Sequence, residues 1–72
     1  MILVMMQHAW GKGETIDEAD KIARREGGHG RKKVSRIVFH YDPEKTTKTY
    51  IDGMGRLCWE GERPLEVERV KV

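Results

Sequence analysis

Residues 15–28 read TIDEADKIARREGG and carry the signals of one complete helix. Thr15 with Glu18 three residues later forms a capping-box pattern, which occupies the free N–H groups at a helix start. The pair Gly27-Gly28 is typical of a helix end, because glycine readily adopts the left-handed backbone found there. The sequence therefore predicts a helix from about Ile16 to Glu26.

One narrow apolar stripe runs along this predicted helix, at spacings of three and four residues: Ile16, Ala19, Ile22 and Ala23. Two of its four members are alanines, so the helix can approach a sheet closely. Acidic residues crowd its first turn and basic residues its last, which suits the helix dipole. Asp20 and Arg24 stand four residues apart in the favourable order for an ion pair.

The segments around the helix predict strands and turns. Residues 1–9 are apolar on both faces as far as Gln7, as in a central strand, and the glycines of residues 10–13 predict a turn. After the helix, strands are expected over residues 35–41, 46–51, 56–60 and 65–72, with turns between them. The apolar positions of the last strand change phase, which predicts a β-bulge near Glu68-Arg69.

The order strand, helix and four further strands predicts an α+β fold. We expect two layers, with one helix packed on an antiparallel sheet of four to five strands. A chain of 72 residues with 38% hydrophobic residues forms one domain, residues 1–72, with a thin core. Dimerisation would add stability to so small a domain, so both a monomer and a homodimer stay open.

A single cysteine, Cys58, excludes an internal disulfide and favours a cytoplasmic location. The apolar opening, residues 1–6, has no preceding basic residue and no following cleavage site, and is too short to span a bilayer. We therefore expect a buried strand there, and no membrane partner.

The net charge of +2 hides a marked asymmetry. Residues 21–36 hold seven basic residues and one acidic residue, while the segments on either side are net acidic. This local excess is the feature that most suggests a partner. The predicted contact residues are Arg24, Arg25, Arg31, Lys32, Lys33 and Arg36, centred on the loop of residues 28–36.

Three interpretations of the basic residues stay open. They can meet acidic residues of a protein or ribonucleoprotein, neutralise the phosphates of DNA or RNA, or serve only solubility. In a further alternative, acidic helix positions such as Asp17 and Asp20 mimic phosphates in a partner's nucleic-acid channel. The five aromatic residues favour core packing over base stacking, and Phe39 in particular is expected to be buried.

Other chemistry finds little support in the sequence. The soft and imidazole ligands His8, His29, His40 and Cys58 lack the spacing of a metal site, although His8 and His40 could meet across adjacent strands. Cys58 lies between Leu57 and Trp59 in a short predicted strand, which is unlike the setting of a reactive thiol. We expect no cofactor and no enzymatic activity.

The run of residues 10–23, WGKGETIDEADKIA, resembles a turn-and-helix entry found in small α+β proteins encoded by phages, prophages and plasmids. Residues 50–59, YIDGMGRLCW, are similar to the hairpin that closes some of them. Members of that group include proteins that block host defence complexes, CRISPR effectors among them. The resemblance implies a non-enzymatic accessory protein that occupies a surface of a host complex.

Overall fold

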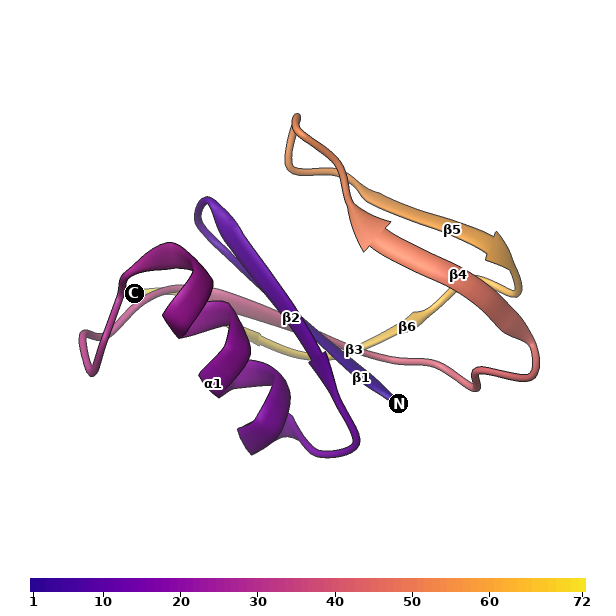
Figure 1. Ribbon diagram of the computed structural model, residues 1–72, viewed down its shortest axis with the longest axis horizontal. Coiled ribbons are helices and arrows are strands. Elements are labelled where there is room, and N and C mark those ends of the chain that lie inside the picture. Colours follow the sequence, from indigo (N-terminus) through magenta and orange to yellow (C-terminus); the bar gives the residue numbers. More distant parts are fainter.

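One helix and six strands form in the computed structural model, which describes all of residues 1–72 (Figure 1). In chain order they are β1 (Ile2–Met6), β2 (Ala9–Gly13), α1 (Ile16–Gly27), β3 (Arg36–His40), β4 (Thr46–Ile51), β5 (Leu57–Gly61) and β6 (Leu65–Val70).

The predicted helix is confirmed together with both of its ends. Thr15 Oγ1 accepts a hydrogen bond from the Glu18 N–H at 3.2 Å, which caps the first turn. Gly28 closes the helix at φ 65°, in the left-handed region that favours glycine.

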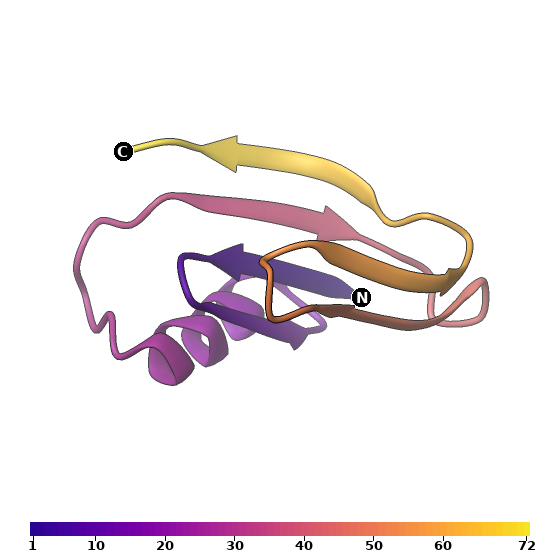
Figure 2. The same ribbon diagram turned by 90° about the horizontal axis from the view of Figure 1, so that it is seen from above.

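A four-stranded antiparallel sheet of order β2-β1-β3-β6 forms the centre of the molecule. Helix α1 packs on one face of it, over β2 and β1, so the predicted α+β class is confirmed. Seen from above, α1 lies at the β2 side of the sheet, and β6 runs along the opposite side (Figure 2). The core on the helix face consists of Ala19 and Ala23 against Ile2, Val4, Met6 and Val38.

The remaining strands, β4 and β5, form a separate antiparallel pair. This hairpin lies on the face of the central sheet opposite the helix (Figure 1). There Ile51 and Leu57 pack against a second core cluster made of Leu3, Phe39 and Tyr41. Phe39 is buried, as the sequence predicted. The central sheet thus matches the predicted antiparallel sheet of four to five strands, and the hairpin forms a second, two-stranded sheet beside it.

Strand β2 replaces the turn predicted at residues 10–13, and the first strand ends at Met6 instead of near Ala9. The chain reverses at Gln7-His8 and returns along β1, with Met6 opposite Ala9. Gly11 lies under the helix, where an added Cβ would come within 2.5 Å of the Ala19 carbonyl oxygen. The glycine there serves close packing of helix on strand, so its interpretation as a turn residue was wrong.

His8, in the reversal between β1 and β2, is the one non-glycine residue with a positive φ, at 63°. We expect His8→Gly to raise the free energy of unfolding by about 0.5–1 kcal/mol, because glycine relieves the left-handed backbone strain. Urea unfolding measures the change. Gln7→Gly is the control at the neighbouring position, where φ is not positive, and it should not stabilise the protein.

The predicted irregularity in the last strand is present. The register of β3 with β6 shifts between Val38, opposite Glu68, and Phe39, opposite Glu66. The extra residue is therefore Val67, one position before the predicted Glu68-Arg69. The shift accounts for the change of apolar phase along β6.

Candidate binding surface

The six predicted contact residues divide into two groups. Arg24 and Arg36 are half-buried and form ion pairs within the chain. The other four are exposed and form none: Arg25, Arg31, Lys32 and Lys33. The structure therefore assigns two of the six to folding and leaves the other four exposed and without an ion pair.

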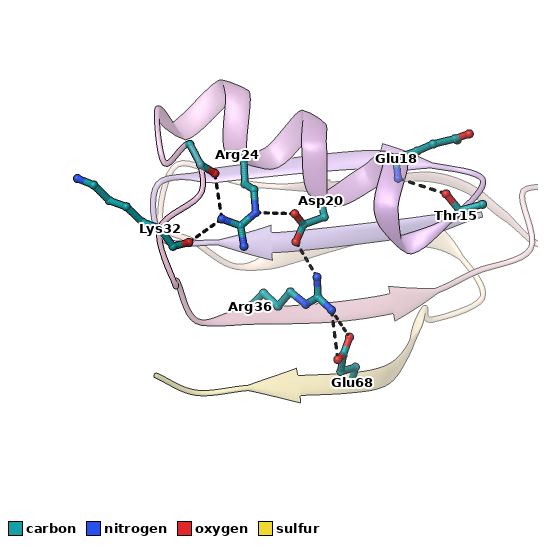
Figure 3. A network of polar contacts seen from close by, with 8 residues as sticks. Thr15, Glu18, Asp20, Arg24, Lys32, Arg36 and Glu68 are labelled. Carbon is teal, nitrogen blue, oxygen red and sulfur yellow. Dashed lines mark hydrogen bonds and ion pairs between the residues drawn. The ribbon is translucent and has the colours of Figure 1, made fainter.

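Asp20 is the centre of the ion-paired group (Figure 3). Its Oδ1 accepts a hydrogen bond from Arg24 Nε at 2.6 Å, and its Oδ2 accepts one from Arg36 Nη1 at 2.7 Å. Arg36 Nη2 also donates to both carboxylate oxygens of Glu68, at 3.0 and 3.2 Å. The network joins the helix to β3 and to the edge strand β6.

The protonation of these groups follows from the network. Burial of Asp20 opposes its ionisation, but the hydrogen bonds and charges of Arg36 and Arg24 outweigh that cost and lower its pKa. The hydrogen bond to Asp20, supported by Glu68, raises the pKa of Arg36. Both groups therefore stay charged at neutral pH, and their charges largely cancel within the network.

The loop between α1 and β3 is held in place by side chains that bond to main-chain carbonyl oxygens. Arg24 Nη1 donates to the carbonyl oxygens of Gly30, at 3.1 Å, and Lys32, at 2.6 Å. His29 Nε2 donates to the carbonyl oxygen of Gln7 at 2.9 Å, which ties the loop to the reversal between β1 and β2. The conformation of the loop is therefore set without the side chains of its own basic residues.

Those basic side chains are exposed and form no ion pair. Figure 3 shows the Lys32 side chain pointing away from the network while its carbonyl oxygen bonds to Arg24. Glu26 is the single acidic residue between Lys21 and Arg36, and no aromatic residue lies in that segment. The segment thus presents exposed positive charge on an ordered backbone, without a Phe, Tyr or Trp ring on which a base could stack.

The interpretation of acidic helix positions as phosphate mimics is wrong for Asp20. Its side chain is only 13% exposed, and both carboxylate oxygens already accept hydrogen bonds from arginine. Asp17 is exposed, so it alone of the two is accessible to a partner.

The structure also places the candidate metal and nucleophile residues. His40 pairs with Ile2 at one end of β1, whereas His8 follows Met6 at the other end, so the two histidines do not meet. No group of three His, Cys, Asp or Glu side chains is arranged to hold a metal ion. The Cys58 thiol is half-buried and lies 3.7 Å from Asp52 Oδ2. The single helix is too short and too polar to cross a membrane.

Sequence reasoning missed the two acidic partners of Arg36, which hold that side chain within the fold. The spacing of Asp20 and Arg24 indicated an ion pair, which the structure confirms at 2.6 Å. No local signal joined Arg36 to Asp20 or to Glu68, because these residues lie 16 and 32 positions away along the chain.

Comparisons with protein-family models, with curated proteins and with solved structures found no match for this chain. The functional argument therefore depends on the geometry of the surface itself.

Proposed function

We propose that this chain is a non-enzymatic binding domain that attaches to an acidic surface of a macromolecular partner. Its contact residues are the four free cations, Arg25, Arg31, Lys32 and Lys33. The observation that supports this most is that Arg24, and not the basic side chains of the loop, holds the loop in place. That side chain fixes the loop through the carbonyl oxygens of Gly30 and Lys32, which leaves the loop's own cations unpaired.

A loop whose backbone is already ordered suits binding. A surface that is ordered before contact loses less conformational entropy on association than a mobile loop does. Clustered charges of one sign also speed the encounter with an oppositely charged partner, and they do so more strongly at low ionic strength.

The composition of the loop favours a carboxylate-bearing protein surface over a nucleic acid. The exposed aromatic residues Tyr50 and Trp59 belong to the separate hairpin β4–β5, and each ring already has a cation over it, at 5.5 Å from Lys48 and 5.3 Å from Arg63. A single-strand binder would place exposed rings within its main basic cluster, whereas these two rings lie outside residues 21–36. The resemblance to phage-encoded proteins makes a complex of the host cell the partner we expect, and a defence complex the one of most interest.

A charge-reversal pair tests the proposal. At ~50 mM salt we expect the protein to bind polyglutamate, with an affinity that falls steeply as salt is added. Lys32→Glu with Lys33→Glu should weaken that binding at least about tenfold, because it reverses two of the four contact charges. Fluorescence anisotropy of labelled polyglutamate measures both effects.

The control variant changes the net charge of the protein by the same amount, but outside the basic loop. Lys45→Glu with Lys48→Glu alters two exposed lysines in and before β4, and it should leave the affinity nearly unchanged. Equal weakening by both pairs would mean that only net charge matters, which contradicts a localised surface. Tighter binding to a DNA duplex of about 20 base pairs than to polyglutamate would favour direct nucleic-acid binding instead.

A further inference from the structure

The outer edge of β6 is open. This strand pairs with β3 on one side only, and the helix lies over β2 and β1 at the other side of the sheet (Figure 2). Beyond Val70 the chain continues beside the residue that precedes β3, since the Val72 N–H donates to Ser35 Oγ at 3.0 Å. Four apolar side chains of this edge are between 40% and 71% exposed: Leu65, Val67, Val70 and Val72.

A groove of about 500 Å³ lies between the basic loop and the end of β6. Val34, Val70 and Val72 supply its apolar surface, and its other lining residues are the cations Arg24, Lys33, Arg36 and Lys71. No acidic residue lines it. Asp20 and Glu68 together balance Arg24 and Arg36, whereas Lys33 and Lys71 form no ion pair and leave the groove positive.

The charges along β6 are distributed unevenly. Glu66 is paired with Arg69 at 2.6 Å, and Glu68 with Arg36 at 3.0 Å, so the first part of the strand is balanced. The segment from Val70 to Val72 carries only Lys71 and faces the cationic groove. An open strand edge with exposed valines and uncompensated positive charge thus lies directly beside the proposed contact loop.

We propose that the edge of β6 accepts an extended acidic peptide, which adds as a fifth strand to the central sheet. Main-chain hydrogen bonds to β6 hold the peptide, its apolar side chains lie on Val70 and Val72, and its carboxylates meet Lys33 and Lys71. This inference rests on the proposed function, because it assigns the acidic partner a protein nature and a conformation.

Other occupants fit this edge less well. A nucleic acid offers no main-chain donors and acceptors with the spacing of a strand, and it gains little from the exposed valines. A second copy of this chain, paired through β6 about a two-fold axis, brings like charges together. With the axis at Glu68 that residue meets itself, and with the axis at Arg69 the arginines meet.

The probe is an acetylated, fluorescein-labelled peptide of alternating valine and glutamate, about eight residues long. Titrated into the full chain, it should move the amide resonances of residues 65–72 and of Lys33 in heteronuclear NMR spectra. A peptide of the same sequence with alternate N-methylated residues should bind at least about tenfold more weakly, since it cannot form the strand hydrogen bonds. The same peptide with lysine in place of glutamate should not bind.

Variants of the protein test the groove, and the N-methylated peptide and the β6 resonances separate this inference from the proposed function. Lys33→Glu with Lys71→Glu should weaken binding of the peptide at least about tenfold. Lys45→Glu with Lys48→Glu should leave that binding unchanged. Circular dichroism checks that both double variants fold. Equal binding of the N-methylated peptide overturns strand addition. Binding of polyglutamate without movement of the β6 resonances also overturns it, while the proposed function stands.

If neither polyglutamate nor the peptide binds the protein, both proposals are overturned. A single-stranded oligonucleotide that displaces the peptide and moves the same β6 resonances at lower concentration assigns the groove to nucleic acid, and so overturns the peptide proposal.

Discussion

Replacing Asp20 with asparagine is expected to lower the free energy of unfolding by about 3 kcal/mol. Asparagine keeps the size of the side chain but removes the negative charge that Arg24 and Arg36 share at 2.6 and 2.7 Å. Because Asp20 is only 13% exposed, water does little to replace that charge. A domain of this size has a few kcal/mol of stability in total, so much of it would be lost. Urea unfolding at pH 7 measures the effect.

Repeating the urea unfolding at lower pH tests whether the charge of Asp20 causes the difference in stability. The pKa of Asp20 is lower in the folded protein than in the unfolded chain, where aspartate titrates near 4. Its contribution is therefore complete above about pH 4 and is lost as the pH falls through the lower, folded pKa. The difference in free energy of unfolding between the native protein and the D20N variant should therefore shrink as the pH is lowered through that pKa. Glu26→Gln, at an exposed helix position, should change stability by less than about 0.5 kcal/mol, and a D20N variant no less stable than this control would contradict the prediction.

Gly11→Ala is expected to lower the free energy of unfolding by about 2–3 kcal/mol, although alanine usually improves a strand. The new Cβ would lie 2.5 Å from the Ala19 carbonyl oxygen and 2.7 Å from the Ala23 nitrogen. Both atoms belong to the helix backbone and cannot rotate aside, so the helix must move away from β2. Thermal unfolding, followed by circular dichroism, measures the loss.

Gly53→Ala is the matched control for this substitution. A Cβ at Gly53 meets nothing within 4 Å, and the φ of that residue is not positive. The control should therefore alter stability by less than about 0.5 kcal/mol. If the two variants were equally stable, the close contact between helix and strand would not be what requires a glycine at position 11.

Local signals in the sequence predicted most of the secondary structure. The helix was predictable because its cap, its stop and its stripe of small residues all lie within residues 15–28. Strand β2 was not, because the reason for Gly11 is a helix that comes later in the chain. Sequence patterns also predicted strands near β4 and β5 but not their separation into a second sheet. Pairing depends on which faces of the central sheet remain uncovered once the helix has packed.

The candidate surface was predictable only as an excess of charge. The sequence indicated the six basic residues, and the pattern treated them as equivalent. Asp20 pairs with Arg24 within the helix, at a spacing that the sequence shows. Only the assembled sheet, however, brings Asp20 and Glu68 close to Arg36. The groove beside β6 had no sequence signal, because Val34 and Val70 come together only when β6 pairs with β3.

Because Arg24 bonds to carbonyl oxygens of the loop, the sequence of the loop can vary without loss of its conformation. Main-chain oxygens are the same whatever side chain a residue carries, so substitutions at Arg31, Lys32 or Lys33 leave the loop's conformation in place. New recognition surfaces can arise there without a compensating change in the core. A protein engineer could therefore diversify the same few codons while the scaffold stays intact.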